Sequence, residues 1–299
     1  MKENDFLSWI ANQSRPHPDI ALHIGDDMAA VRTPAGHPLA LLKIDQCLDQ
    51  VHFDLRSHTP AQAGRKAVNR CLSDCAAMAC LPAAILLSLA LPKDATEAFT
   101  RELFLACQGA AGEFDCPLVG GDTGIWDQRL AITVAALGWS AGPVVSRAGA
   151  QPGDVICVTG ALGGSIMGRH LTFAPRIREA LQLTAVAPIH AMMDLSDGLA
   201  MDLPRLCASS GVGAVIESRL VPIHPDVARL TTAQSPVQHA LSDGEDYELL
   251  FTLPEDAWEG MRGQWPTTAT RLTSIGRITK EKTLIMDGYP LPAGGWEHV

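Results

Sequence analysis

The sequence predicts a mixed α/β protein built from two domains. Strand-like apolar runs and helix-like segments alternate along both halves of the chain, which is typical of sheets covered by helices. The length of 299 residues fits one large or two medium domains. Residues 146–154 are polar and rich in turn formers, so we expect one domain over 1–145 and a second over 146–299.

In the first half, Phe6, Leu7 and Ile10 mark an amphipathic helix, and an alanine-rich run behind a Thr59 cap and Pro60 marks a longer one. Apolar runs between the helices predict strands. The expected order is helix 5–14, strand 38–44, helix 61–78, strand 84–91, helix 94–112, and strands 116–119 and 130–138.

In the second half, the predicted elements are strand 155–159, helices 176–184 and 198–210, strand 211–216, strand 249–252, helix 255–262, and strands 271–277 and 283–286. A glycine-rich turn, 160–165, follows the first of these strands. Such a turn is able to cradle a phosphate, but it matches neither a Walker A loop nor G-x-G-x-x-G, so the signal is weak on its own.

Composition excludes some classes of function and indicates the cellular compartment. The chain has 33 acidic against 23 basic residues, which argues against a nucleic-acid surface and suits bound cations. Its eight cysteines form no C-x-x-C pair and are expected to be free thiols in a reducing compartment; a metal site at Cys71, Cys75 and Cys80 would match no zinc spacing. No signal-peptide core or membrane-length apolar run is present, so we expect a cytoplasmic protein that does not contact membranes.

The stretch from Met193 to Leu203 carries the first chemical signal. Asp194 and Asp197 are three residues apart, so at a helix start both carboxylates face the same way. Ser196 or Asp197 would cap that helix and leave backbone N–H groups to meet an anion. The alternative is a capped helix start without a ligand.

Similar acidic segments recur along the chain, each after or at the end of an apolar run: Gly25–Asp27, Ile44–Asp45, Leu72–Asp74 and Gly120–Asp122. Asp74 lies within the predicted helix among alanines and cysteines, where a carboxylate needs a partner or a metal. Residues 242–248 hold four acids before an apolar strand, a site candidate or a solvated turn. His52 lies in an apolar triplet, where a core histidine is the alternative to a ligand.

The ordered set of motifs resembles the thiamine-monophosphate kinases, of the aminoimidazole-ribonucleotide-synthetase-like ATP-binding superfamily, over nearly the whole chain. The motifs are Ile24–Asp27, Asp49–Phe53, Leu72–Met78, Gly120–Thr123, Arg147–Asp154, Met193–Leu199, Gly244–Phe251 and Gly295–His298.

The resemblance implies a homodimer whose N-terminal domain binds metal and ATP and pairs with a second copy, while the C-terminal domain closes the active site. The implied reaction transfers the γ-phosphoryl group of ATP to thiamine monophosphate, with several Mg²⁺ ions. The implied metal ligands are Asp27, Asp45, Asp74, Asp122, Asp194 and Asp197, of which Asp194 and Asp197 are also the catalytic pair. The implied nucleotide contacts are Gly121, Asp122, Arg147 and Ser196, and the substrate contacts are His52, Glu245 and Trp296. Trp296 either stacks on the thiazolium ring or anchors the C-terminus.

The chain also departs from the family pattern at Lys43-Ile44, Gln50 and Asp243, and between Gly168 and Pro175, where it is short. These departures keep two alternatives open: an ATP-dependent enzyme of the superfamily with a different small acceptor, and a non-catalytic protein that binds nucleotide or thiamine phosphate. Because alternate strand positions share a face, Lys43 is expected beside Asp45, with its ammonium either among the carboxylates or bent out to solvent.

Overall fold

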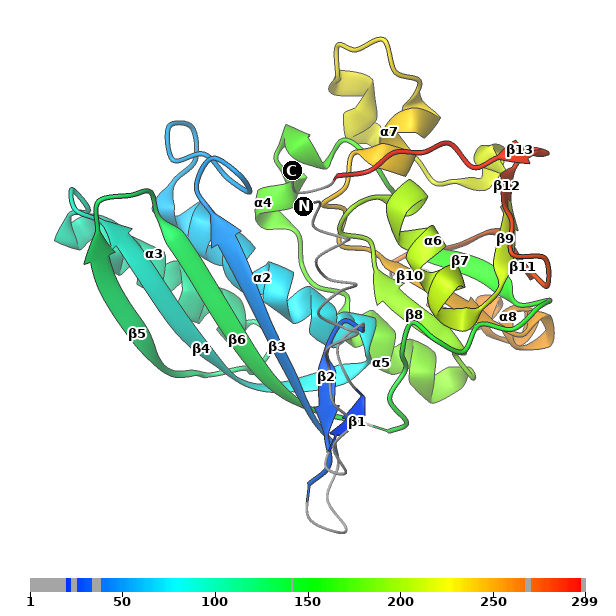
Figure 1. The fold of residues 1–299 in the computed structure, drawn as a ribbon, viewed down its shortest axis with the longest axis horizontal. Coiled ribbons are helices and arrows are strands. Elements are labelled where there is room, and N and C mark those ends of the chain that lie inside the picture. The colour runs from blue at the N-terminus through cyan, green and yellow to red at the C-terminus, as the bar shows by residue number, and fades with distance from the viewer. Residues whose placement is uncertain (1–19, 23–25, 34–38, 141, 267–269, 297–299) are drawn as a thin grey trace.

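The computed structural model describes residues 20–22, 26–33, 39–140, 142–266 and 270–296. The predicted helix 5–14 and the residues just before Asp26 lie outside these ranges. Two sheets with helices against them stand side by side, which confirms the predicted α/β class (Figure 1). Strands of the first sheet end at Ser140 and those of the second begin at Val155, while the exact domain boundary stays a prediction.

The first sheet has six strands in the order β1-β2-β3-β6-β4-β5, antiparallel except for the parallel pair β4 and β5. The strands are β1 (Ile20–Leu22), β2 (Ala29–Val31), β3 (Ala40–Leu48), β4 (Cys80–Pro92), β5 (Leu118–Trp126) and β6 (Ala131–Ser140). Helices α2 (Pro60–Ala77) and α3 (Glu97–Gly112) lie behind this sheet in Figure 1.

Helix α2 packs against both halves of the molecule. As predicted, Thr59 caps it, in a capping box with Gln62, and Pro60 occupies its first turn. Its alanine and cysteine side chains pack on the first sheet, and the same buried cluster continues into Cys157 and Phe251 of the second. Residues on α2 therefore meet side chains from both halves.

The second sheet has seven strands in the order β13-β12-β9-β11-β7-β10-β8, antiparallel except for β9 and β12. They are β7 (Val155–Thr159), β8 (Ala191–Asp194), β9 (Gly213–Ile216), β10 (Leu249–Leu253), β11 (Leu272–Thr279), β12 (Leu284–Met286) and β13 (Tyr289–Pro290). The helices of this half are α4 (Arg169–Thr172), α5 (Ile177–Val186), α6 (Leu199–Ser210), α7 (Pro236–Ser242) and α8 (Glu255–Arg262). Among the described helices, none is long and apolar enough to cross a membrane.

Two predicted strands, 38–44 and 116–119, end too early. Asp45 lies inside β3, and Gly120–Thr123 lies inside β5, which extends to Trp126. Glycines at an edge strand mimic a turn signal, but the backbone of β5 pairs with β4 along its whole length. The consequence is that Asp45 and Asp122 occupy fixed sheet positions, each with a defined face.

Candidate active site

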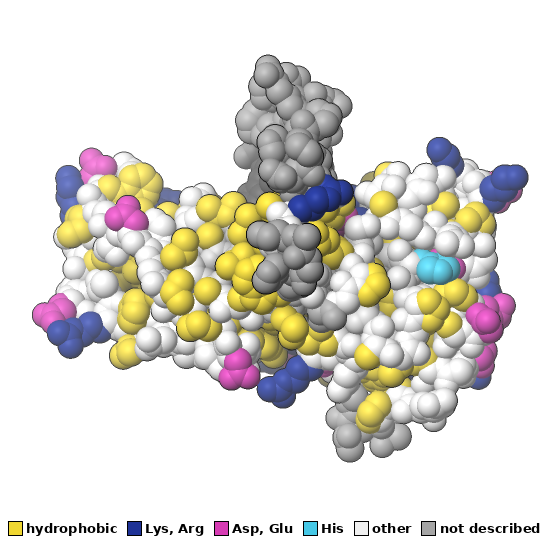
Figure 2. Space-filling model, turned by 90° about the horizontal axis from the view of Figure 1, so that it is seen from below, with side chains coloured by type: hydrophobic (Ala, Val, Ile, Leu, Met, Phe, Trp, Pro, Cys, Tyr) yellow, Lys and Arg dark blue, Asp and Glu magenta, His cyan; other side chains and the backbone are white. Residues whose placement is uncertain are grey.

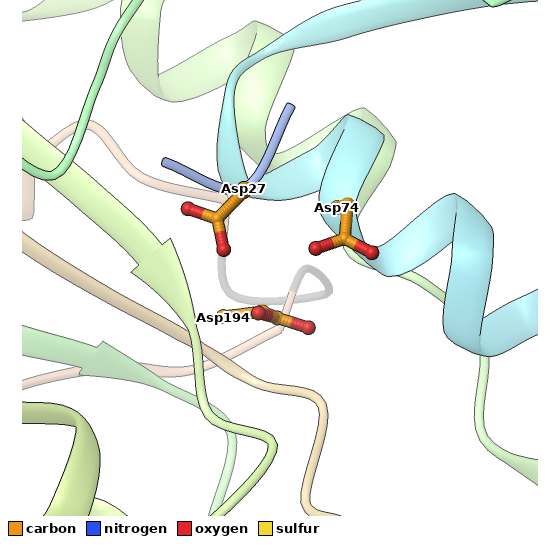
Figure 3. A group of neighbouring side chains, drawn as sticks. All are labelled: Asp27, Asp74 and Asp194. Carbon is orange, nitrogen blue, oxygen red and sulfur yellow. The ribbon is translucent and has the colours of Figure 1, made fainter. Parts of the chain in front are cut away.

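Three buried carboxylates from distant parts of the chain converge: Asp27 just before β2, Asp74 near the end of α2, and Asp194 at the end of β8. Each offers an oxygen, and these oxygens lie within 4.8 Å of one another. Figure 3 shows the three side chains pointing toward a common space. Carboxylate oxygens are hard ligands that suit Mg²⁺, so the residues present fit a magnesium site.

The electrostatics of this acidic cluster are those of a site that needs a cation. Burial, followed by the charge of Asp27, raises the pKa of Asp194 to about 6, although Ser73 Oγ donates a hydrogen bond to its Oδ2 at 2.5 Å. Burial also raises the pKa of Asp74 well above its usual value. Neighbouring carboxylates disfavour each other's ionised form, and a bound divalent cation would relieve that repulsion.

Arg147 is the partner of Asp27. Its Nε donates to Asp27 Oδ2 at 3.0 Å and its Nη2 donates to Oδ1, while its backbone N–H donates to Asp26 Oδ2 at 3.1 Å. Burial and the adjacent Asp27 raise the pKa of Asp26 to about 6. The predicted nucleotide contact thus lies at the edge of the acidic cluster.

Helix α2 presents Lys66, Arg70 and Asp74 at intervals of four residues, on one face. Facing them from β3, Lys43 Nζ lies 3.1 Å from Asp74 Oδ2, and Asp45 Oδ2 lies 3.4 Å from Arg70 Nε. The ammonium of Lys43 therefore sits among the carboxylates, and the solvent-facing alternative is wrong.

These groups line a cavity of about 1290 Å³ between the two halves of the chain. The structure brings ten of the twelve predicted site residues to it: Asp27, Asp45, His52, Asp74, Arg147, Asp194, Ser196, Asp197, Glu245 and Trp296. Gly121 and Asp122 do not line it. The cavity is large enough for a nucleotide and a second small molecule together.

At another part of the cavity, the fully buried Lys66 contacts Glu245 at 2.7 Å and His170 Nδ1 at 2.8 Å, and donates to the carbonyl of His52. Burial would raise the pKa of Glu245, but the hydrogen bond with His170 and the charge of Lys66 hold it at about 2. Sequence reasoning missed Lys66 and His170 as site residues; the four-residue spacing of Lys66 from Arg70 and Asp74 was a usable signal.

His52 and Trp296 stand together in the cavity wall, with ring centroids 5.8 Å apart. The Trp296 amide donates to the Asp197 carbonyl at 3.0 Å, which fixes the C-terminal segment against the site. Trp296 remains 38% exposed, so part of the residue is accessible to a ligand in the cavity.

The predicted geometry of Asp194 and Asp197 is wrong. Asp194 ends β8, whereas Asp197 precedes α6 and pairs with Arg205. Neither Ser196 nor Asp197 caps α6; Asp202 accepts from the amides of Asp197 and Gly198 at 3.0 and 3.1 Å. Asp197 therefore lies on the cavity wall but outside the acidic cluster.

The backbone amides of the glycine-rich turn donate hydrogen bonds to side chains of this same chain. The amide of Gly163 donates to Asp246 at 2.9 Å, and that of Gly164 donates to Asp243 at 2.7 Å. Because these two amides already donate to carboxylates of this chain, they hold the turn against residues 243–246 and do not bind a phosphate. Asp243, one of the departures in the acidic motif, has this structural role.

Asp122 lies on the opposite face of the first sheet. In the register of β4 and β5 it pairs with Ser88, whose neighbours Leu87 and Leu89 are buried beneath the helices while Ser88 is exposed. Gly121 pairs with Leu87 on the covered side. Within one chain, Asp122 therefore faces away from α2 and the acidic cluster.

Asp194→Asn is expected to change how stability depends on pH in metal-free protein. The Asp194 pKa rises from 3.8 to about 6 on folding, so its stabilising contribution is present below pH 3.8 and is lost as the pH rises through 6. Asparagine removes that loss, so the variant should gain about 3 kcal/mol relative to the parent between pH 4 and 7. Urea unfolding in EDTA at both pH values measures this difference; an equal difference at both would contradict it.

Comparisons with known proteins agree with the geometry. Models described as AIR synthase related protein, N-terminal and C-terminal domains, match residues 25–140 and 151–287. The thiamine-monophosphate kinase of Rhodopirellula baltica is 36% identical over 282 residues, covering 91% of this chain and 89% of that protein. The Escherichia coli K12 thiamine-monophosphate kinase is 33% identical over 307 residues, covering 94% and 92%.

Solved structures agree as well. "AaThiL complexed with AMPPCP and TMP" has a TM-score of 0.87 at 29% identity and covers 100% of this chain and 97% of that chain. The thiamine monophosphate kinase from Aquifex aeolicus has a TM-score of 0.81 at 28% identity, covering 97% and 99%. The chain therefore belongs to the AIR synthase related family and, within it, to the thiamine-monophosphate kinases.

Proposed function

We propose that this chain phosphorylates thiamine monophosphate to thiamine diphosphate with ATP as the donor. The observation that carries the proposal is the buried acidic cluster of Asp27, Asp74 and Asp194 on a cavity with room for two ligands. The acceptor is already an anion, so the reaction needs no strong base. It needs charge neutralisation and alignment of donor and acceptor.

Different residues of the cavity would neutralise and align the phosphates. Asp27, Asp74 and Asp194 would hold Mg²⁺, which when bound supplies positive charge to the phosphates. Arg147 orients Asp27 and lines the cavity beside it. Asp45, Asp122 and Asp197 remain predicted ligands that lie outside the cluster.

The thiamine end of the acceptor is proposed to bind at His52, Glu245 and Trp296. Glu245 stays ionised because of His170 and Lys66, and an anionic side chain attracts the thiazolium cation. The exposed indole of Trp296 offers a π face for the same ring. The two together favour a flat, cationic heterocycle over a neutral acceptor.

We also propose a homodimer. The face of the first sheet opposite the helices exposes Leu42, Ile44 and Leu86, and Trp126 on the edge strand β5 pairs with Pro92 on the same face. Figure 2, seen from below, shows hydrophobic side chains spread over the half of the molecule that holds the first sheet, with charged ones mainly at its margin. A second copy is the occupant that this face fits, and Asp122 on the same face would then belong to the partner's site.

Mixing two inactive variants tests this arrangement. If Asp122 acts on the partner's site, Asp27→Asn and Asp122→Asn subunits that exchange should regain about a quarter of parental activity, since half the dimers are mixed and each has one intact site. Activity before and after mixing, with subunit exchange followed by labelled chains, measures this. No recovery despite exchange would place Asp122 in its own chain's site, and an Asp122→Asn protein that is active on its own would place it outside catalysis.

The experiment that tests the function is an acceptor comparison. The purified protein is incubated with Mg²⁺, ATP and either thiamine monophosphate, thiamine or unrelated small phosphates and carboxylates. Thiamine diphosphate and ADP formed from the monophosphate support the proposal. ADP formed only with another acceptor supports a different superfamily enzyme, and tight binding without turnover supports a non-catalytic binding protein.

The cellular setting is proposed from the cysteines. All eight are free and buried in the structure, which fits a reducing compartment, so we place the protein in the cytoplasm.

A further inference from the structure

Lys43 is positioned by the alternation of β3. Leu42 and Ile44 are exposed on the open face of the sheet, so Lys43 points to the opposite side, toward α2. Its ammonium lies 3.1 Å from Asp74 Oδ2, and the side chain is 26% exposed, so solvent screens the pair only in part. The backbone of a central strand thus holds a permanent positive charge against one carboxylate of the acidic cluster.

Arg70 repeats this arrangement one turn earlier on α2. Its Nε lies 3.4 Å from Asp45 Oδ2, and its side chain is 15% exposed and lines the same cavity. Its Nε and Nη1 are buried and, among the described residues, form no hydrogen bond. A buried guanidinium with unused donors is costly unless something else accepts from it, and phosphate oxygens suit its geometry.

Three of the carboxylates that line the cavity form ion pairs with basic side chains. Arg147 pairs with Asp27, Lys43 with Asp74 and Arg70 with Asp45. In the described residues, Asp194 has no ion pair and accepts a hydrogen bond from Ser73. Two of the six predicted metal ligands are therefore neutralised by Lys43 and Arg70, neither of which is itself able to ligate a metal while protonated.

We propose that Lys43 and Arg70 are cations supplied by the protein for phosphoryl transfer, taking over at Asp74 and Asp45 positive charge that additional Mg²⁺ would otherwise provide. The inference rests on the proposed function. It restricts divalent binding to the space among Asp27, Asp74 and Asp194, and it commits Asp45 to holding Arg70. We assign the unused donors of Arg70, which lines the cavity, to a phosphate oxygen of a bound substrate.

The test counts metal ions directly. Mn²⁺ is titrated into the protein with a saturating non-hydrolysable ATP analogue, AMPPCP, and free Mn²⁺ is followed by electron paramagnetic resonance. Lys43→Thr should bind about one more ion per chain than the parent. The Mg²⁺ concentration that gives half-maximal turnover should rise about tenfold, because turnover of this variant requires an additional, weakly bound ion. Lys43→Arg keeps the charge and should keep the parental count.

A matched control and a metal-free measurement separate charge from folding. Lys93 is exposed in the turn after β4, so Lys93→Thr should match the parent in every assay. In EDTA, Lys43→Thr should melt about 2–4 °C lower than the parent, because Asp74 has lost its partner, and Mn²⁺ with AMPPCP should restore most of the loss. Arg70→Gln should raise the KM for ATP or the acceptor about tenfold, whereas Arg101→Gln, on the surface of α3, should not.

The Mn²⁺ counts and the Mg²⁺ dependence distinguish this inference from the proposed function. Equal Mn²⁺ counts and equal Mg²⁺ dependence in the parent and Lys43→Thr would overturn the inference while leaving the proposed kinase intact. A parent that binds no Mn²⁺ with AMPPCP would overturn the proposed magnesium site and this inference with it. An extra ion in Lys43→Thr that is absent in Lys43→Arg would support it, even if turnover falls in both.

Discussion

Replacing Asp27 by asparagine is expected to lower kcat about 10³-fold, the scale on which single charged groups act in phosphoryl transfer. Asp27 is the member of the acidic cluster that also pairs with Arg147, so the change removes a proposed metal ligand and one hydrogen-bond partner of the arginine. The amide keeps the shape of the side chain, and the fold should persist. Steady-state kinetics over a Mg²⁺ range, with circular dichroism for the fold, measure both effects.

The matched control is Asp127→Asn, which removes an exposed carboxylate in the loop between β5 and β6 and should leave kcat unchanged. If Asp27→Asn recovered near-parental kcat at high Mg²⁺, Asp27 would be a weak electrostatic contributor and not a required ligand. If both variants lost activity equally, net charge rather than the acidic cluster would be responsible.

Glu245→Gln is expected to destabilise the protein by about 3 kcal/mol, because it leaves the ammonium of Lys66 buried without its carboxylate. The Lys66 side chain is 0% exposed, and burial already lowers its pKa. The deficit should shrink as the pH rises and Lys66 loses its proton. Urea unfolding at pH 7 and pH 9 measures the difference from the parent.

The double variant Lys66→Met, Glu245→Gln removes the stranded charge and should recover most of the stability. It should still bind thiamine monophosphate poorly, since the carboxylate that we propose attracts the thiazolium is gone. If the double variant were as unstable as the sum of the single ones, the Lys66–Glu245 pair would not be the source of the loss.

Sequence reasoning predicted the parts of the fold that local chemistry determines. The Thr59 cap with Pro60 marks the start of α2 because capping and a fixed proline φ act within one turn. The extension of β5 through Gly120–Thr123 was missed, since only pairing with β4 makes those glycines a strand. Tertiary pairing outweighs local turn preference there.

For the site, the motifs predicted residues that line one cavity, but not how their charges are paired. Lys43 was placed beside Asp45 by strand alternation, whereas its contact with Asp74 depends on the packing of α2 against β3. Asp197 and Asp194 are near neighbours in sequence, yet the chain leaves β8 between them and Arg205 takes Asp197. Such pairings are set by contacts between elements far apart in the chain, which spacing does not encode.

This protein transfers the γ-phosphoryl group of ATP to thiamine monophosphate, and we propose that the transfer is direct and occurs at the acidic cluster. The most direct measurement follows the label from [γ-³²P]ATP in the presence of thiamine monophosphate and Mg²⁺, for the parent and Asp27→Asn. We predict label in the terminal phosphate of thiamine diphosphate, in step with ADP, and its loss in EDTA and in Asp27→Asn. Label released as inorganic phosphate without labelled thiamine diphosphate would contradict direct transfer to thiamine monophosphate.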